Sequence, residues 1–183
     1  RLAPDVALAD LEGTRIPFSN IQLEPASFAR GSFGELFKGT WKNETVAVKQ
    51  LVCVPLEAQR IYHEFRREVS IMSSLHHPNL ANLKGFCLEP SPSMVMEYVA
   101  GGNLYSFLHS NDTAPGGPPQ LDAALILKIA FDVANGIKFL HSATPPYIHR
   151  DLKSPNILLA STDPAADVVA KVGDFGLTNR MVI

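Results

Sequence analysis

Three polar residues lie close together in the segment IHRDLKSPN (148–156). Asp151 can accept a proton from a hydroxyl group, Lys153 can stabilise a phosphoryl group in transfer, and Asn156 can ligate a metal ion. The proline before Asn156 excludes a regular helix, so these side chains belong to a loop. A charged surface loop would explain any one of them. The three together, followed by VGDFG at 172–176, favour phosphoryl transfer.

A lysine and a glutamate in the first half of the chain form a second candidate pair. In TVAVKQL (45–51), strand alternation places Ala47 and Lys49 on one face, where a small residue and an ammonium group suit an adenine beside a phosphate. Glu68 falls on the apolar stripe of a helical segment at 56–75, and a carboxylate on a buried face requires a cation. We therefore predict an ion pair between Lys49 and Glu68. The alternatives are a solvent-exposed lysine at a sheet edge and a glutamate at the rim of the stripe.

Two glycines, Gly31 and Gly34, stand between strand-like segments in FARGSFGELFKG (28–39). Glycines there let backbone N–H groups approach phosphate oxygens, because no side chain obstructs the approach. A structural hairpin turn is the more common explanation of this pattern when nothing else supports a binding site. The P-loop of nucleotide hydrolases is excluded, since no Gly-Lys-Ser or Gly-Lys-Thr follows.

The pattern of apolar residues divides the chain into two regimes. Alternating residues predict strands, and a spacing of three or four predicts helices. The first regime is a sheet with one helix and the second is mainly helical, so the predicted fold class is α+β with two lobes joined near residues 97–102. The expected strands are at 21–23, 35–41, 45–51, 80–88 and 93–99, and the expected helices are at 56–75 and 122–141.

Composition sets wider limits on function. The 183 residues are 46% hydrophobic and 19% charged, which is typical of a globular protein. A formal net charge of -2 and a pI near 6.3 give no reason to expect a nucleic-acid partner or an anionic membrane surface. No apolar run approaches the length of a membrane span. Cys53 and Cys87 lack the spacing of a zinc site, so we expect reduced, half-buried thiols and a cytoplasmic setting.

A series of motifs occurs in the order and approximate spacing of the eukaryotic protein kinases: GSFGELFKG, VAVK, REV, HHPN, VMEYV, HRDLKSPN and DFG. The chain resembles this family over roughly residues 18–178. LKSPN and EFRREVSIMSSLHHPNL resemble the tyrosine-kinase-like group of serine/threonine kinases, near the Raf, mixed-lineage and Roco types. The lysine two residues after Asp151 is the serine/threonine form of this loop.

The resemblance implies a protein-kinase-like two-lobe fold. It assigns residues 18–97 to the small lobe, made of the sheet and one helix, and residues 98–183 to the hinge and the first part of the helical large lobe. Residues 1–17 would be an N-terminal extension. The implied reaction is transfer of the ATP γ-phosphate to serine or threonine hydroxyls, with ATP and Mg²⁺ as cofactors and a protein substrate as partner.

The resemblance also implies catalytic roles in the second half of the chain. Asp151 would orient the substrate hydroxyl and accept its proton, with Lys153 near the γ-phosphate. Asn156 and Asp174 would hold magnesium. A spine that links the lobes would consist of Met72, Leu83, His149 and Phe175.

The implied ATP contacts come from both halves of the chain. Lys49, positioned by Glu68, would hold the α- and β-phosphates, and the glycines would cover them. Apolar side chains would enclose the adenine beside the gatekeeper Met96, and its edge would bond the backbone of Glu97 and Val99. The full implied set is Phe28, Ala29, Arg30, Gly31, Ser32, Phe33, Gly34, Leu36, Ala47, Lys49, Met96, Glu97, Val99 and Leu158.

Two features depart from the family pattern. Ala29 stands where the first glycine of the glycine-rich loop is usual, a change that many backbone angles tolerate. The chain also stops at Ile183, before the expected Ala-Pro-Glu segment and the later helices of the large lobe. Thr178 is then the only hydroxyl after DFG that could receive an activating phosphate.

We expect this ending to leave apolar surface uncovered. In the family, the central helix of the large lobe covers the stripe of the 122–141 helix, and that central helix lies beyond the last residue here. Burial stabilises by roughly 25 cal/mol per Å² of apolar area, so the isolated chain is expected to be unstable or sticky. The side chains concerned are Leu125, Ile129, Val133, Ile137, Leu140, Ile157 and Leu159.

Three functions stay open on this basis. The first is a serine/threonine kinase domain, present as a fragment that is not competent alone, which the intact lysine, aspartate, asparagine and DFG support. The second is a nucleotide-binding, pseudokinase-like module that acts through partner proteins, although such modules usually lack one of these residues. The third is a non-functional kinase fragment.

Overall fold

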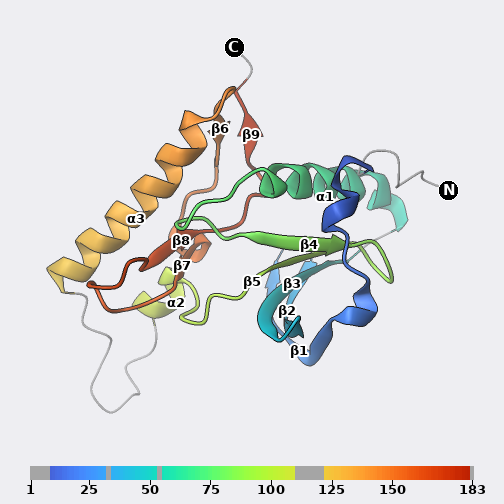
Figure 1. Cartoon of the computed structure of the whole chain (residues 1–183), viewed down its shortest axis with the longest axis horizontal. Coiled ribbons are helices and arrows are strands. Elements are labelled where there is room, and N and C mark those ends of the chain that lie inside the picture. The colour runs from blue at the N-terminus through green and yellow to red at the C-terminus, as the bar shows by residue number, and fades with distance from the viewer. Residues whose placement is uncertain (1–8, 32–33, 53–54, 110–121, 182–183) are drawn as a thin grey trace. The chain divides into compact units, whose positions relative to one another are not determined.

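The computed structural model of the chain forms two compact units (Figure 1). The described residues are 9–31, 34–52, 55–109 and 122–181. The chain enters the second unit twice, because a short segment after the first helix belongs to it. The first unit comprises residues 1–74 and 82–98, and the second comprises residues 75–81 and 99–183.

A five-stranded antiparallel sheet makes up most of the first unit. Its strands lie in the spatial order β1-β2-β3-β5-β4. The predicted sheet is confirmed, although β1 is longer than the segment predicted for it. The strands are β1 (Gln22–Gly31), β2 (Gly34–Trp41), β3 (Glu44–Leu51), β4 (Leu83–Cys87) and β5 (Ser93–Glu97), with 3₁₀ turns at 9–14, 18–20 and 55–57.

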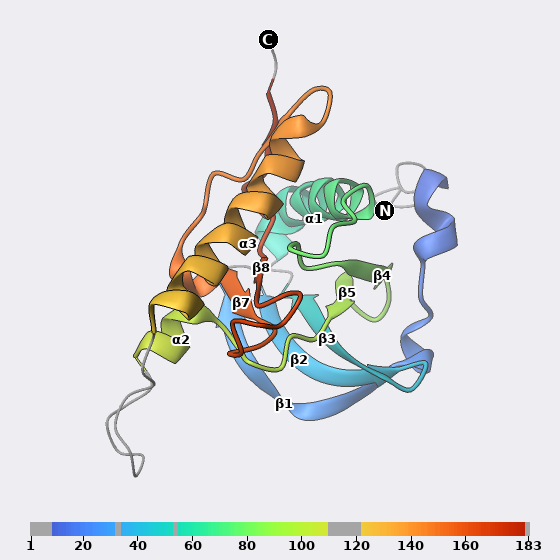
Figure 2. The same ribbon diagram turned by 60° about the vertical axis from the view of Figure 1, so that its left-hand side comes forward.

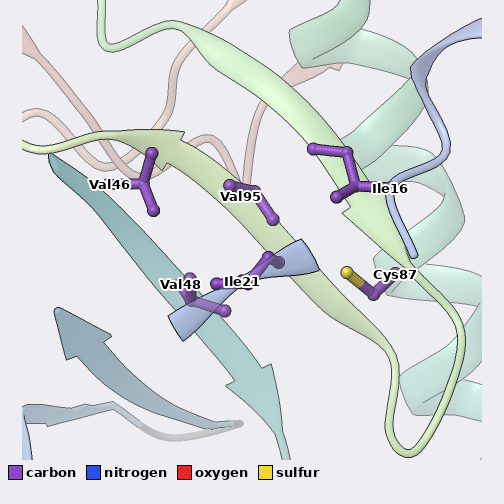
Figure 3. Packing of buried hydrophobic residues seen from close by; sticks show 6 residues of the cluster. All are labelled: Ile16, Ile21, Val46, Val48, Cys87 and Val95. Atoms are coloured by element: carbon purple, nitrogen blue, oxygen red, sulfur yellow. The ribbon is translucent and has the colours of Figure 1, made fainter. Parts of the chain in front are cut away.

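One face of this sheet packs against the segment that precedes β1 (Figure 3). The segment lies so close to β4 that a Cβ at Gly85 would overlap the backbone oxygen of Thr14. Burial raises the pKa of the Cys87 thiol to about 11, so this thiol stays protonated and serves packing. Cys53 lies outside the described residues. The buried cluster consists of Ile16, Ile21, Val46, Val48, Cys87 and Val95.

The other face of the sheet packs against helix α1 (Ala58–Ser73). Phe86 of β4 faces away from Cys87, because successive residues of a strand point to opposite faces. Phe65 of α1 meets this Phe86 edge to face, with ring centres 6.3 Å apart. The predicted helix is confirmed, with Glu68 on its buried side. The buried residues of α1 are Ile61, Phe65, Glu68, Val69, Ile71 and Met72.

Among its described residues, the second unit contains two α-helices, a 3₁₀ turn at 154–156 and two small antiparallel sheets. Its long helix begins after Asp122, whose carboxylate caps the helix by accepting a hydrogen bond from the Leu125 N–H at 2.7 Å. The sequence predicted this helix but not the shorter elements. The elements are α2 (Leu104–Leu108), α3 (Ala123–Ser142), β6 (Tyr147–Ile148) paired with β9 (Asn179–Arg180), and β7 (Ile157–Leu159) paired with β8 (Ala170–Val172).

Helix α3 packs along β8 within the second unit (Figure 2). Its line of fully buried residues runs through Asp132 and Gly136, and the predicted Val133 and Ile137 are only half-buried. Two contacts explain this difference. Asp132 accepts hydrogen bonds from the backbone at the start of β8, and Gly136 leaves room for the backbone oxygen of Asn79. The other members of the buried line are Leu125, Ile129 and Leu140.

The prediction that the apolar residues of this region lack a partner surface is wrong for most of them. The packing of α3 against the β7–β8 sheet buries residues from both elements. The buried side chains are Leu125, Ile129, Leu140, Ile157 and Leu159. The large apolar side chains that α3 exposes are different ones, namely Ile126, Leu127 and Phe131.

Gly136 offers a test of the α3 packing. An alanine Cβ at this position would lie 2.7 Å from the Asn79 backbone oxygen and 3.1 Å from Leu80 Cδ2. We expect Gly136→Ala to lower the free energy of unfolding by ~1–3 kcal/mol in urea denaturation, because this close packing outweighs the better helix propensity of alanine. Ala134→Gly, on the exposed side of α3, is the control and should cost ~1 kcal/mol by propensity alone. A Gly136→Ala protein more stable than wild type would contradict the close contact.

Candidate active site

Lys49 and Glu68 form the predicted ion pair in the first unit. The Lys49 Nζ lies 2.9 Å from Glu68 Oε1 and 3.1 Å from Oε2. The two side chains are only 19% and 9% exposed, so both alternatives, an exposed edge lysine and a rim glutamate, are excluded. Because a buried carboxylate is stabilised by a paired cation, Glu68 fixes the lysine in place.

An apolar surface lies beside Lys49 on the same face of the sheet. In the strand register, Leu36 of β2 lies opposite Lys49, and Met96 of β5 lies opposite Ala47. Opposite residues of antiparallel strands point to one face, as do residues two apart along a strand. Leu36, Ala47, Lys49 and Met96, all predicted ATP contacts, therefore share a face.

The glycines lie where the sequence predicted a turn. Gly31 ends β1 and pairs with Gly34, which begins β2. A Cβ at Gly34 would overlap the backbone oxygen of Gln50 in β3, so the sheet itself requires glycine there. Ser32 and Phe33, between the glycines, lie outside the described residues.

The other predicted residues of this region lie in β1. Ala29 pairs with Leu36, and Arg30 lies 3.4 Å from the carboxylate of Glu35 across the strands. Ala29 therefore adopts ordinary strand backbone, which explains why alanine is tolerated there. Phe28 is 52% exposed and meets the Tyr98 ring edge to face at 5.9 Å.

Asn82 is a contact of Glu97 that sequence reasoning missed. The Glu97 carboxylate accepts hydrogen bonds from the Asn82 backbone N–H at 2.8 Å and from Asn82 Nδ2 at 3.2 Å. The Glu97 N–H in turn donates to the Asn82 carbonyl at 3.0 Å. These bonds fix the end of β5, where the adenine contact was predicted. Val99 belongs to the second unit, where its carbonyl accepts a hydrogen bond from the Gly102 N–H at 3.3 Å.

Asp151, Lys153 and Asn156 come together in the second unit as predicted. Asp151 Oδ2 lies 2.8 Å from Lys153 Nζ and accepts a hydrogen bond from Asn156 Nδ2 at 2.9 Å. Asn156 Nδ2 also donates to the Asp151 backbone oxygen at 2.8 Å. The hydrogen bond from Lys153 lowers the pKa of Asp151, assisted by Asn156, and the same contact raises the pKa of Lys153. Asp151 is therefore ionised at neutral pH and can accept a hydrogen bond from a hydroxyl group.

Asp174 lies next to Asn156 through the β7–β8 sheet. Asn156 immediately precedes β7, and its carbonyl accepts a hydrogen bond at 2.8 Å from the N–H of Gly173, the residue that follows β8. Asp174 is the next residue, is exposed, and has a φ of 58°. The amide oxygen of Asn156 and the carboxylate of Asp174 are hard oxygen donors, so the residues present suit a magnesium ion.

His149 joins the loop that carries Asp151 to the segment that carries Asp174. Its Nδ1 accepts a hydrogen bond from the Asp151 N–H at 3.3 Å, and its Nε2 lies 3.0 Å from the Gly173 carbonyl oxygen. The Phe175 ring is buried and meets the His149 ring edge to face at 5.4 Å. Two members of the predicted spine are thus in contact. Met72 and Leu83 belong to the first unit, and the role of the four residues together stays a prediction.

Two further residues of the second unit bear on the predictions. Leu158, a predicted adenine contact, lies in β7 and is half-buried. Thr178 is fully buried, with its Oγ1 3.5 Å from the His149 carbonyl oxygen. The expectation that Thr178 could receive an activating phosphate is therefore wrong for this structure, because its hydroxyl is not accessible.

A family comparison agrees with this geometry. The family described as protein tyrosine and serine/threonine kinase has a sequence model that matches residues 24–182. The chain belongs to this protein kinase family. The predicted kinase-like fold is confirmed with it, and kinases of this family generally use ATP with Mg²⁺.

Several curated proteins that are similar in sequence to this kinase are named as serine/threonine kinases. It is 43% identical to the probable serine/threonine-protein kinase pats1 of Dictyostelium discoideum, over 97% of its own length and 6% of that protein. It is 52% identical to the probable serine/threonine-protein kinase roco6 of the same organism, over 87% of its length and 7% of the relative. It is 40% identical to the serine/threonine-protein kinase CTR1 of Arabidopsis thaliana, over 89% of its length and 19% of the relative. The chain therefore spans less than a fifth of each of these relatives.

Two negative findings apply to the part of the kinase that the structure describes. None of its helices has both the length and the apolar character needed to cross a membrane. Within the same residues, no three His, Cys, Asp or Glu side chains gather into a metal site. The predicted magnesium ligands, one amide and one carboxylate, do not depend on such a cluster.

The Lys49–Glu68 pair can be tested by a double-mutant cycle. We expect Lys49→Met and Glu68→Gln, alone and together, to show a coupling of ~1–3 kcal/mol in urea denaturation, because each single change leaves a largely buried charge without the opposite charge beside it. The control is the Lys84–Glu44 pair, which is similarly short at 2.8 Å but more exposed, and should show a smaller coupling. Equal couplings for the two pairs would contradict a role for burial.

The Asp151 pKa can be tested by removing Lys153. Because Lys153 favours the ionised carboxylate, Lys153→Met should raise the pKa of Asp151 toward its usual value. The measurement is an NMR titration of the Asp151 carboxyl carbon from about pH 7 to about pH 3. Lys138→Met, at an exposed position of α3, is the control and should leave this titration unchanged. An unchanged titration in Lys153→Met would rule out the assigned cause.

Proposed function

We propose that this kinase transfers the γ-phosphate of ATP to serine and threonine hydroxyls of a protein substrate. The observation that carries the proposal is the network in which Lys153 and Asn156 hold the ionised carboxylate of Asp151. A carboxylate held in this way can orient a hydroxyl and receive its proton as the oxygen attacks phosphorus. A lysine at position 153, two residues after Asp151, is the serine/threonine form of this loop. Serine and threonine as acceptors agree with the names of the relatives.

The first unit would bind the nucleotide. Lys49 would contact the α- and β-phosphates, and its ion pair with Glu68 would keep it in that position. The apolar surface formed by Leu36, Ala47 and Met96 would contact the adenine. The backbone at the end of β5, fixed by Asn82, would bond the edge of the adenine base.

The second unit would hold the acceptor hydroxyl and the metal ion. Asp151 would accept the proton, and Lys153 would contact the γ-phosphate and offset its charge. Asn156 and Asp174 would hold magnesium through their oxygen atoms. When bound, magnesium supplies positive charge that neutralises the phosphate oxygens. We also propose a cytoplasmic location, which the unpaired thiol of Cys87 supports.

The proposal is tested by assaying phosphate transfer from labelled ATP to a generic protein substrate. We expect Asp151→Asn to lower the rate by about 10²–10⁴-fold, because the amide cannot accept the hydroxyl proton. Asp167→Asn is the matched control, since Asp167 is exposed and lies outside the network. Analysis of the phosphorylated residues should find phosphoserine and phosphothreonine. Transfer to tyrosine alone, or equal rates for Asp151→Asn and wild type, would refute the proposal.

The melting temperature of the same protein, measured with and without Mg·ATP, distinguishes a kinase from a nucleotide-binding module. Mg·ATP should raise the melting temperature of wild type, because a ligand that binds only the folded state stabilises it. A raised melting temperature without phosphate transfer would instead favour a module that acts through partners. A protein with neither property would be a non-functional member of the family.

A further inference from the structure

Asp132 is a buried carboxylate in α3 that the proposed reaction does not use. Its side chain is nearly inaccessible, with the residue only 1% exposed. One oxygen, Oδ2, accepts hydrogen bonds from the backbone N–H groups of Val169 at 2.7 Å and of Ala170 at 3.0 Å. The other oxygen, Oδ1, accepts one from Lys128 Nζ at 2.9 Å. The carboxylate thereby holds two consecutive residues at the start of β8.

Lys128 adds a second connection between α3 and the same segment. Besides its contact with Asp132, its Nζ donates a hydrogen bond to the backbone oxygen of Asp167 at 2.8 Å. The side chains of Lys128 and Asp132, one helical turn apart, therefore bind three backbone groups of the segment 167–170. The position of β8 along α3 is set by these directional bonds in addition to apolar packing.

Burying the charge of Asp132 at this position costs desolvation free energy. Burial raises the pKa of Asp132, but hydrogen bonds from Lys128 and from the two backbone N–H groups outweigh it and hold the pKa below its usual value. An apolar side chain of similar volume would pack α3 against the sheet without this desolvation cost. The bonds of Asp132 thus supply a definite position for β8, which apolar packing alone does not specify.

A series of hydrogen bonds continues from Asp132 along β8 to Gly173. Asn79 donates through Nδ2 to the Ala170 carbonyl at 3.1 Å and accepts from the Val172 N–H at 2.9 Å. The Gly173 N–H then donates to the Asn156 carbonyl, and the Gly173 carbonyl contacts His149. These bonds connect the start of β8 to the backbone next to Asp174.

The β7–β8 sheet relates the two ends of this series. The register pairs Leu159 with Ala170 at one end and Ile157 with Val172 at the other. Asp132 contacts the first end, and Asn156 and Asp174 flank the second. A strand rises about 3.3 Å per residue, so the carboxylate lies on the order of 10 Å along the sheet from the proposed metal ligands.

We infer that Asp132 is a positioning residue, which sets the spacing of Asn156 and Asp174 by holding the start of β8 and so controls the affinity for a divalent cation. The inference rests on the proposed function, because it assigns the cation to those two residues. A residue that served only folding would lower stability without changing cation affinity. The two roles are therefore separable by experiment.

The test measures Mn²⁺ binding, by electron paramagnetic resonance, to the purified protein with a non-hydrolysable ATP analogue. We expect Asp132→Asn to bind Mn²⁺ about tenfold more weakly than wild type, because the amide loses the charge and its NH2 group must face other donors, either Lys128 Nζ or the backbone N–H groups of β8. Amide hydrogen exchange at Val172 and Gly173 should also become faster. Leu140→Val is the control, because Leu140 is fully buried in the same helix but lies about two turns beyond Asp132, near the C-terminal end, and it should lower stability while leaving Mn²⁺ affinity unchanged.

Each outcome decides the inference. Unchanged Mn²⁺ affinity in a destabilised Asp132→Asn protein overturns it, as does an equal loss of affinity in Leu140→Val. If Asp132→Asn does not fold, Lys128→Gln is measured in its place. A loss of Mn²⁺ affinity of a few fold in Lys128→Gln supports the inference, and wild-type affinity overturns it. If wild type binds no Mn²⁺ with the nucleotide analogue, the magnesium site of the proposed function fails together with the inference.

Discussion

A carboxylate removed from water must be paired, and each unit of this kinase meets that constraint with a lysine. In the first unit, Glu68 of α1 pairs with Lys49 of β3. In the second unit, Asp132 of α3 pairs with Lys128 and with two backbone N–H groups at the start of β8. Each buried carboxylate thereby ties a helix to one strand. Lys49, assigned to the phosphates, lies on one of these strands, and Asp174, assigned to the metal, lies two residues after the other.

The ion pair of Asp151 and Lys153 differs from these two pairs, because its side chains are more exposed to water. Ion pairs at the surface contribute little to the free energy of folding. The contact of Lys153 with Asp151 matters instead for protonation and direction. It keeps the carboxylate ionised, and Lys153 and Asn156 both contact the same carboxylate oxygen, Oδ2. Stability and chemistry thus use the same residue types at different depths of burial.

The larger elements were predictable because their side chains repeat often enough to show a period. The strands of the first unit alternate, and α1 and α3 follow the helical spacing over several turns. The strands β6 to β9 contain two or three residues each, which is too few for a period to be visible. The buried line of α3 was misplaced for another reason. Apolar periodicity selects Val133 and Ile137, whereas the contacts with β8 and Asn79 favour Asp132 and Gly136.

The sequence by itself determined the kinase family, the main elements of both units, and the residues that could do phosphoryl-transfer chemistry, because those residues lie in short motifs whose order is visible along the chain. It also determined the Lys49–Glu68 pair, since a glutamate on an apolar stripe requires a cation. Only the tertiary structure decided that residues 75–81 belong to the second unit, that Thr178 is buried, and that Asp132 and Asn82 hold β8 and β5. These features depend on contacts between groups far apart in sequence. Every residue except proline has the same backbone N–H group, so the sequence does not show which side chain will bind a given one.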